Sequence, residues 1–482
     1  MNHLLNDERN LTMLLDFYEL TMANGYLQSG LADTSACFDL FFRRVPDGGG
    51  FAIMAGTAQL AEYLQRLHFA PRDLDYLRER GFPADFLEYL KNLCFCCDVS
   101  AVPEGTPIFP GEPIVTVRGP ILQTQLIETM ALLCINHQSL IATKACRIAR
   151  AAQGRAVMEF GARRAQGYDG AVFGARAAYI GGCSSTSCTL SDQRFGIPAG
   201  GTMAHSWVQL FDTELEAFCA YAKQYPGSCT LLVDTYNTLR SGVPNAIEAF
   251  RRELLPRGFR PQAIRIDSGD IAYLSIKARA MLDEAGFSDC AIIASNSLDE
   301  YIIRDMLMQG ARVDSFGVGE RLITAASDPV FGGVYKLCAL EKDGKMQPKI
   351  KLSENVTKVT TPCVKKVWRL FDRASGKAIA DLLTLADEIL DETQPYELFD
   401  PDYTWKRKTV SDFIAKPLLE PLFVKGAFVG ETRDIHEIRD FCAAQTEALW
   451  DEVLRFENPH NYYVDLSQAL WDEKQRLIGE SR

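Results

Sequence analysis

One histidine lies in a stretch of the sequence, from Arg155 to Trp207, that is rich in residues able to bind anions. His205 follows the residues GGTMA, which favour a strand that ends in a turn. An imidazole at the end of a strand can act as a base or can accept a phosphoryl group. The position therefore predicts His205 as a candidate catalytic residue.

Phe160, Arg163 and Arg164 lie near the start of the same stretch. A phenylalanine ring offers a face for stacking, and guanidinium groups bind carboxylates or phosphates. Together these residues favour a flat, acidic aromatic ligand. If the motif stood alone, a core phenylalanine beside two surface ion pairs would be the better explanation.

A second polar motif, RIDSGD, places Arg265, Asp267 and Asp270 around a glycine turn after a predicted strand. Arginine binds diphosphate, and carboxylates bind ribose hydroxyls and Mg²⁺. Capping of the next helix by Asp267 or Ser268 is a structural alternative that is compatible with a site. The motif predicts a site for diphosphate and magnesium.

Two turns further along the chain are candidates for binding a sugar phosphate. The segment DSFGVGERL contains Gly317 and Gly319, and the backbone N–H groups of such a turn can bind an anion. The segment ASNSLDE, one predicted strand earlier, places Ser295 or Asn296 to cap a helix and to meet a phosphate. Plain structural turns explain the glycines equally well.

Six apolar segments from residue 156 onwards are each followed by glycine or by polar residues. As strands these segments are 156–160, 196–204, 230–236, 263–270, 291–297 and 313–320. The helices predicted between them are 207–225, 238–255, 270–286 and 298–310. This β/α repetition predicts a parallel sheet, and in a barrel the reactive groups lie where strands end. The strand ends also carry Asp234, Thr235 and Glu320.

The chain before residue 119 predicts an α+β lobe. Apolar spacing favours helices at 11–27, with Tyr18 on the apolar face, and at 51–67, with a strand at 36–46 between them. Prolines and glycines favour short strands at 101–120. A helix follows at 122–148, and its spacing allows a break near Asn136.

These patterns divide the chain into three parts. The α+β lobe covers 1–118 and is completed by β-like segments at 336–430. An α/β catalytic domain covers 119–335, and a charged helical tail covers 431–482.

The acidic balance of the chain limits its partners. Its 482 residues include 51 basic and 63 acidic side chains, a formal charge of -12 that disfavours nucleic acid. No apolar run approaches the roughly 18 residues of a membrane span, and the first residues do not resemble a secretory signal. The fourteen scattered cysteines favour thiols over disulfides. We therefore expect a cytoplasmic protein that binds neither nucleic acid nor membranes.

The motifs together resemble those of the nicotinate phosphoribosyltransferase family, nearly end to end. The segments that carry the resemblance include DFYELTMANGY, FDLFFRRVPDGGGFAIMAG, EFGARRAQGYDG, GIPAGGTMAHSW, LLVDTYNTLRSGVPNAI, RIDSGD, FGVGERL and NPHNYYVDLSQALW. The resemblance implies a type II phosphoribosyltransferase, with an irregular α/β barrel beside an N-terminal lobe, acting as a homodimer with shared sites. It implies that nicotinate and 5-phosphoribosyl 1-diphosphate form nicotinate mononucleotide in NAD salvage, with Mg²⁺ and with ATP as co-substrate.

The resemblance also implies roles on the side of the base. Tyr18 would stack on the pyridine ring from the neighbouring subunit, opposite Phe160, and Arg163 would assist. Arg265 and Thr202 would help to hold nicotinate or the diphosphate.

On the phosphate side, His205 matches the histidine that the family phosphorylates with ATP. The residues that would bind the ribose phosphate are Ser295, Asn296, Gly317 and Gly319. Glu320 stands where the family often has a threonine, so we expect this turn to bind phosphate through its backbone N–H groups.

Two other functions are compatible with these residues. One is the same reaction with nicotinamide, which an arginine-rich site disfavours because nicotinamide lacks the carboxylate. The other is a catalytically silent nucleotide-binding or regulatory homologue. Cys188, where the family commonly has an asparagine, and Glu320 are the two departures that keep this alternative open.

Overall fold

The computed structural model describes residues 9–355 and 358–480. The chain divides into two compact units. The first combines Met1–Leu140 with Val330–Arg482, and the second is Ile141–Pro329. The residues at the strand ends discussed above all belong to the second unit.

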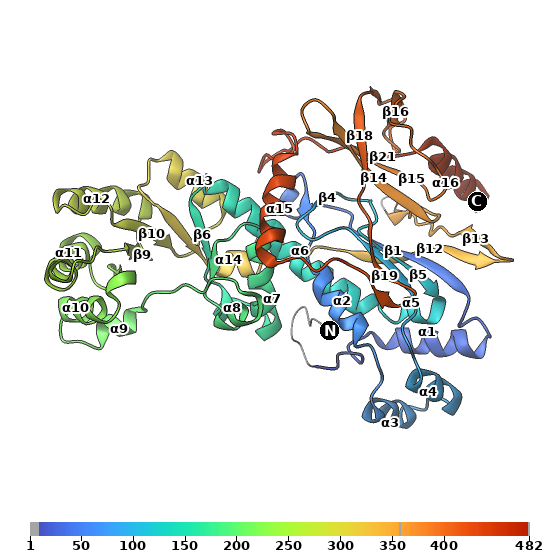
Figure 1. The fold of residues 1–482 in the computed structure, drawn as a ribbon, viewed down its shortest axis with the longest axis horizontal. Coiled ribbons are helices and arrows are strands. Elements are labelled where there is room, and N and C mark those ends of the chain that lie inside the picture. The colour runs from blue at the N-terminus through green and yellow to red at the C-terminus, as the bar shows by residue number, and fades with distance from the viewer. Residues whose placement is uncertain (1–8, 356–357, 481–482) are drawn as a thin grey trace. The chain divides into compact units, whose positions relative to one another are not determined.

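A six-stranded parallel sheet forms the second unit, as the β/α repetition predicts (Figure 1). Its strand order is β7-β6-β11-β10-β9-β8. The strands are β6 (Ala156–Glu159), β7 (Ser185–Thr186), β8 (Thr230–Leu232), β9 (Ala263–Ile266), β10 (Ala291–Ser295) and β11 (Ser315–Val318). Among the described residues the two edge strands, β7 and β8, are not paired with each other. The fold is therefore a mixed α/β fold with a parallel sheet.

Helices alternate with these strands. They are α7 (Gly167–Ile180), α8 (Thr189–Phe195), α9 (His205–Gln209), α10 (Glu214–Gln224), α11 (Val243–Ala249), α12 (Ile271–Glu284), α13 (Glu300–Met308) and α14 (Glu320–Ile323). Helix α11 continues into π-helical turns on both sides, at Thr238–Gly242 and Phe250–Leu254. The predicted helix 207–225 is instead two helices, because Thr213 and Glu216 form a capping box that starts α10.

The predicted strand 196–204 is wrong. Only Ala199 makes a bridge, to Thr186 of β7. The segment contains Gly200 and Gly201. Glycine weakens a strand because it has no side chain to pack and because it loses more conformational entropy on folding than any other residue.

The first unit contains a seven-stranded antiparallel sheet in the order β13-β12-β1-β5-β3-β19-β20. Its strands are β1 (Ser35–Phe41), β3 (Asp98–Ala101), β5 (Val115–Pro120), β12 (Val334–Lys342), β13 (Lys345–Pro348), β19 (Glu420–Val424) and β20 (Ala427–Phe428). Strands β1 and β12 pair although the whole second unit lies between them in the sequence (Figure 1).

Smaller sheets complete the first unit. A four-stranded sheet has the order β18-β14-β15-β21 and consists of β14 (Lys365–Asp372), β15 (Ala378–Leu385), β18 (Phe413–Pro417) and β21 (Val464–Leu466). Two-stranded sheets consist of β2 (Ala52–Ile53) with β4 (Pro107–Ile108), and of β16 (Tyr396–Phe399) with β17 (Arg407–Val410). The predicted helical tail thus includes a strand, β21, which pairs with β15.

The helices of the first unit are α1 (Phe17–Gln28), α2 (Thr57–Gln65), α3 (Pro71–Glu79), α4 (Ala84–Lys91), α5 (Ile121–Gln125), α15 (Ile435–Glu447) and α16 (Gln468–Glu480). Helix α6 (Glu128–Ala151) begins in the first unit and ends in the second. The break that we allowed near Asn136 is absent, since α6 runs through this residue and the helix is interrupted before Glu128 instead. The Asn136 side chain instead accepts a hydrogen bond from the backbone of Gly333 at 3.0 Å. No helix among the described residues is long and apolar enough to cross a membrane.

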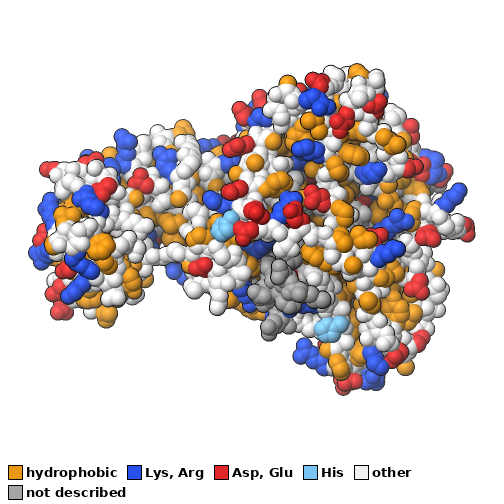
Figure 2. Space-filling view, viewed as in Figure 1, with side chains coloured by type: hydrophobic (Ala, Val, Ile, Leu, Met, Phe, Trp, Pro, Cys, Tyr) orange, Lys and Arg blue, Asp and Glu red, His pale blue; other side chains and the backbone are white. Residues whose placement is uncertain are grey.

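Figure 2 shows basic and acidic side chains interspersed over the visible face, without a broad basic area. The chain carries a net acidic charge. A polyanion would need a concentrated basic surface to overcome that charge.

Candidate active site

His205 lies beside two residues from neighbouring strand ends. Its Nδ1 is 3.1 Å from the hydroxyl of Thr235, which follows β8, and its Nε2 is 3.9 Å from a carboxylate oxygen of Asp267, which follows β9. The imidazole side chain is 41% exposed and the Asp267 side chain 33%, so a ligand can reach both. The histidine singled out in the sequence therefore lies near the carboxyl edge of the parallel sheet, although the strand from which this position was predicted is absent and His205 instead opens α9.

Asp234, which is buried, and Arg265, which is partly buried, lie at the same edge. Arg265 donates from Nη1 to the hydroxyl of Thr202 at 2.7 Å. Asp234 accepts hydrogen bonds from the backbone of Asp267 at 3.0 Å and from the Ser268 hydroxyl at 2.5 Å. Within the described chain, Oδ1 of Asp234 and Nε of Arg265 are buried without a hydrogen-bond partner. Such orphaned atoms are costly unless a ligand, ion or water satisfies them.

Burial lowers the pKa of the Arg265 guanidinium, against the opposing effects of the Asp267 and Asp234 carboxylates. The charge of Arg163 lowers it further, so the structure brings these two arginines within electrostatic reach. A carboxylate or phosphate placed beside them would relieve the repulsion.

The turn after β10 has an unusual backbone. Ser295 donates a hydrogen bond to Asp267, and the next residues, Asn296 and Ser297, adopt positive φ angles of 87° and 51°. Non-glycine residues in this region are strained, and such strain concentrates at functional sites. The capping role expected for Ser295 or Asn296 is wrong, because Asp299 caps α13 and accepts hydrogen bonds from the backbone of Tyr301 and Ile302.

Asp270 likewise serves as the N-cap of α12, in place of the predicted Asp267 or Ser268, and accepts a hydrogen bond from the backbone of Tyr273 at 3.0 Å. Asp267 is thereby left available, with one oxygen bonded to Ser295 and the other facing His205.

Gly317 makes room for Phe160. A Cβ at Gly317 would lie 2.5 and 2.6 Å from two carbons of the phenylalanine ring, a separation that no real Cβ tolerates. The backbone N–H of Phe160 also donates to the carbonyl of Val318 at 2.8 Å. Gly319 is close as well, since a Cβ there would lie 3.1 Å from the Phe160 carbonyl. The glycine turn thus has a packing role that the sequence did not reveal.

Glu320 opens α14 and pairs with Arg164 across 3.7 Å. Both side chains are about three-fifths exposed, at 62% and 60%. In this pair the Glu320 carboxylate faces a positive charge. The backbone N–H groups of the turn are then the candidate hydrogen-bond donors to a bound anion.

Tyr18 lies in the first unit, on α1, and the apolar face on which it was predicted to lie is exposed rather than packed in the core. Its exposed fraction is 42%, whereas Leu20 and Ala23 are the buried apolar residues of this helix. Burial and the neighbouring Glu128 carboxylate raise the pKa of the Tyr18 hydroxyl. The ring is therefore available on the surface of this chain.

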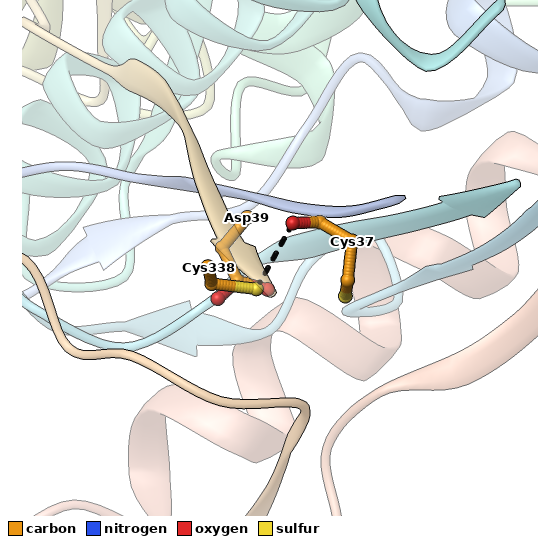
Figure 3. A group of neighbouring side chains, drawn as sticks. All are labelled: Cys37, Asp39 and Cys338. Carbon is orange, nitrogen blue, oxygen red and sulfur yellow. Dashed lines mark hydrogen bonds between the residues drawn. The ribbon is translucent and has the colours of Figure 1, made fainter. Parts of the chain in front are cut away.

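A separate group of three buried side chains in the first unit has the composition of a metal site: Cys37, Asp39 and Cys338 (Figure 3). A positively charged side chain already pairs with this group, because the ammonium of Lys365 lies 2.7 Å from a carboxylate oxygen of Asp39. The same ammonium donates to three backbone carbonyls, those of Thr361, Pro362 and Cys363. The carboxylate is neutralised by this lysine, and we assign the group to the core of the first unit.

The comparisons with known proteins agree with this geometry. Three family models match consecutive parts of the chain: the nicotinate phosphoribosyltransferase N-terminal domain at 13–136, the family itself at 155–374 and the C-terminal domain at 364–474.

Relatives match nearly the whole chain. A nicotinate phosphoribosyltransferase from Bacillus subtilis is 44% identical over 98% of this chain and 96% of its own length, and the human one is 32% identical over 95% of each. The crystal structure of human nicotinic acid phosphoribosyltransferase matches with a TM-score of 0.83 at 30% identity, covering 97% of this chain and 99% of that one. With its strand-end residues brought together at one edge of a matching fold, the chain belongs to the nicotinate phosphoribosyltransferase family.

Proposed function

We propose that this chain forms nicotinate mononucleotide and diphosphate from nicotinate and 5-phosphoribosyl 1-diphosphate, in a reaction coupled to ATP hydrolysis through phosphorylated His205. The reaction would serve NAD salvage. The observation that carries the proposal is the convergence of His205, Thr235, Asp267 and Ser295 at one sheet edge in a member of this family.

Nicotinate would bind between Phe160 and the two arginines. The ring of Phe160 can stack on the pyridine, while Arg163 and Arg265 supply positive charge for the carboxylate. The buried, unpartnered Nε of Arg265 offers a donor for such an oxygen. Thr202 holds the guanidinium by accepting a hydrogen bond from its Nη1. This arrangement favours nicotinate over nicotinamide, because the amide carries no negative charge.

The phosphates would bind at the neighbouring strand ends. Consecutive residues with positive φ, Asn296 and Ser297, can present backbone N–H groups to the ribose phosphate, next to Ser295. Gly317 and Gly319 would complete this side of the site.

Carboxylate oxygens at the same edge fit a magnesium ion, since Mg²⁺ prefers oxygen ligands. Asp234 has a buried oxygen without a partner among the described residues, and Asp267 is partly exposed. We propose Asp267 as the principal ligand, with Asp270 contributing from the N-cap of α12. When bound, Mg²⁺ would neutralise charge on the departing diphosphate.

In the reaction, the pyridine nitrogen would bond to the anomeric carbon of the ribose as the bond from that carbon to diphosphate breaks. The sugar carries positive charge in the transition state, so the protein needs little acid–base chemistry and much positioning. Arg265 would stabilise the negative charge on the leaving group or hold the base. In the ATP step, an imidazole nitrogen of His205 would bond to the γ-phosphorus as the bond to ADP breaks.

We also propose a homodimer in which Tyr18 completes the partner's site opposite Phe160. The exposed apolar side chains around the start of α1 support this proposal. Their exposed fractions are 47% for Leu14, 47% for Phe17, 42% for Tyr18 and 36% for Met22. Such a group of apolar side chains is typical of a surface that another molecule covers.

Two finer features complete the proposal. The parallel sheet would belong to the irregular barrel of the type II phosphoribosyltransferases. The cytoplasm would be the location, which agrees with the lack of disulfides among the described residues.

The test is product formation by the purified chain. Nicotinate, 5-phosphoribosyl 1-diphosphate and Mg²⁺ are supplied with and without ATP, and nicotinate mononucleotide is measured by chromatography. We expect product in both cases and more with ATP. Nicotinamide in place of nicotinate should give far less product. Binding of nicotinate mononucleotide without any turnover would overturn the proposal in favour of a silent homologue.

A further inference from the structure

Glu159 is a buried carboxylate that directly precedes Phe160 at the end of β6. Its exposed fraction is 0%, and burial raises its pKa. One oxygen accepts a hydrogen bond from the backbone N–H of Gly161, and the other accepts one from the Thr186 hydroxyl at 2.7 Å. A buried carboxylate is costly unless its oxygens are bonded, so both contacts hold the residues around it in place.

Thr186, at the end of the neighbouring strand β7, extends this set of hydrogen bonds. While its hydroxyl donates to Glu159, the same oxygen accepts a hydrogen bond from the backbone of Cys188 at 3.0 Å. The backbone of Ser187 donates to the Glu159 carbonyl at 2.8 Å. The turn after β7 is therefore fastened to Glu159 by both side-chain and main-chain bonds.

The main chain of Thr186 also contacts the segment that leads to His205. Its N–H donates to the carbonyl of Pro198 at 3.0 Å, and its carbonyl accepts a hydrogen bond from Gly200 at 2.8 Å. This segment continues to Thr202, which accepts the hydrogen bond from Arg265. Hydrogen bonds thus link the segment of Phe160 to the segment of Thr202.

The packing around Glu159 leaves little freedom for it to move. A Cβ at Gly161 would lie 2.8 Å from a Glu159 oxygen and 2.5 Å from Ile323. The ring of Phe160 is in contact with Gly317 on the other side. Because protein interiors are close-packed, a displacement of Glu159 would be passed on to Phe160.

We infer that Glu159 is a positioning residue. Through Thr186 it joins the base-binding segment Phe160–Arg163 to the segment Pro198–Thr202. The hydrogen bonds of Glu159 therefore set the affinity for the acidic aromatic base. The inference rests on the proposed function. Glu159 touches no reacting atom. It acts by fixing the positions of the Phe160 ring and of Thr202, the hydrogen-bond partner of Arg265.

The test uses variants of Thr186. Thr186→Val keeps the size of the side chain and removes the hydroxyl, whereas Thr186→Ser keeps the hydroxyl. We expect Thr186→Val to raise the KM for nicotinate about tenfold, with kcat and the KM for 5-phosphoribosyl 1-diphosphate changed less than about twofold. Thr186→Ser should restore the wild-type KM. Glu159→Gln should act in the same direction as Thr186→Val, because one amide oxygen cannot replace two acceptors.

Ser191→Ala is the matched control. Ser191 is also a fully buried hydroxyl of the second unit, and it donates to the carbonyl of Val172 at 3.2 Å, outside the set of bonds around Glu159. Equal KM values for Thr186→Val and Ser191→Ala, or failure of Thr186→Ser to restore the KM, would overturn the inference. Calorimetric titration with nicotinate mononucleotide makes the same comparison without turnover, so the inference and the proposed function can fail separately.

Discussion

At the scale of single residues, the site depends on a position without a side chain as well as on particular side chains. Gly317 lacks the Cβ that would collide with the ring of Phe160. His205 has one imidazole nitrogen against Thr235 and the other facing Asp267. Each residue leads to a prediction that concerns one side chain.

Gly317→Ala should displace the Phe160 ring, because the added methyl group would overlap two ring carbons. We expect a higher KM for nicotinate and a stability loss of about 1–3 kcal/mol, as for other overpacked sites. Steady-state kinetics and thermal unfolding measure the two effects. Gly227→Ala is the control, since a Cβ at Gly227 has no atom within 4 Å. If both variants behave alike, Gly317 does not set the position of Phe160.

His205→Ala should abolish stimulation by ATP while part of the basal reaction remains. The imidazole is the proposed phosphoryl acceptor, and the transfer to ribose uses other residues. Product formation with and without ATP, together with acid-labile incorporation of labelled γ-phosphate, measures the change. His436→Ala, in the first unit, is the control. Stimulation that survives in His205→Ala would contradict the phosphohistidine role.

At the scale of elements, α1 is joined to the start of α6 by a buried carboxylate. Glu19 has an exposed fraction of 0% and accepts hydrogen bonds from both the backbone and the hydroxyl of Thr129. Thr129 in turn accepts a hydrogen bond from the backbone of Asp16, the N-cap of α1, at 3.1 Å. The position of Tyr18 therefore depends on how firmly these two helix starts are joined.

This contact should make stability depend on pH. Burial raises the pKa of Glu19 from 4.5 to about 7, although its bonds to Thr129 oppose the shift. Between these values the folded state keeps a proton that the unfolded state releases, so stability falls as pH rises through this window. The fall is on the order of 3 kcal/mol.

Glu19→Gln cannot titrate and should lose this part of the pH dependence. Thermal unfolding at pH 5 and pH 8 measures it, and the wild type should lose more stability than the variant across that interval. Glu79→Gln, an exposed position on α3, should keep the wild-type dependence. Equal pH dependence in the wild type and Glu19→Gln would show that Glu19 does not titrate in this range.

At the scale of the whole molecule, the proposed site needs residues from two chains. Tyr18 belongs to the first unit and Phe160 to the second. In the proposed dimer, each site takes Phe160 from one copy and Tyr18 from the other.

Mixing two inactive variants tests this arrangement. Tyr18→Ala and Phe160→Ala should each weaken activity strongly. After exchange of subunits in an equal mixture, half of the dimers are mixed and each holds one intact site, so about a quarter of the wild-type activity should return. A mixture no more active than its components, with mixed dimers shown by native mass spectrometry, would place Tyr18 and Phe160 in separate roles.

The sequence by itself determined the parallel α/β unit and most of its strand ends. Apolar runs that alternate with amphipathic helices depend on local spacing, so strands β6 and β8 to β11 lie where they were predicted. The carboxyl ends of parallel strands share one edge, and this rule placed the residues after β8, β9 and β10, among them Asp267, as neighbours. His205 was placed with them through a strand at 196–204 that the structure does not form, so its position beside Asp267 was decided by the tertiary structure.

Only the tertiary structure decided what each side chain contacts. Glu159 bonds to Thr186 across 27 positions of the sequence, and Arg265 bonds to Thr202 across 63. The exposed face of Tyr18 and the fit of Phe160 over Gly317 likewise follow from packing between distant segments. Spacing along the chain reports the period of an element, whereas hydrogen bonds and close contacts between elements depend on how the elements pack, which no local pattern encodes.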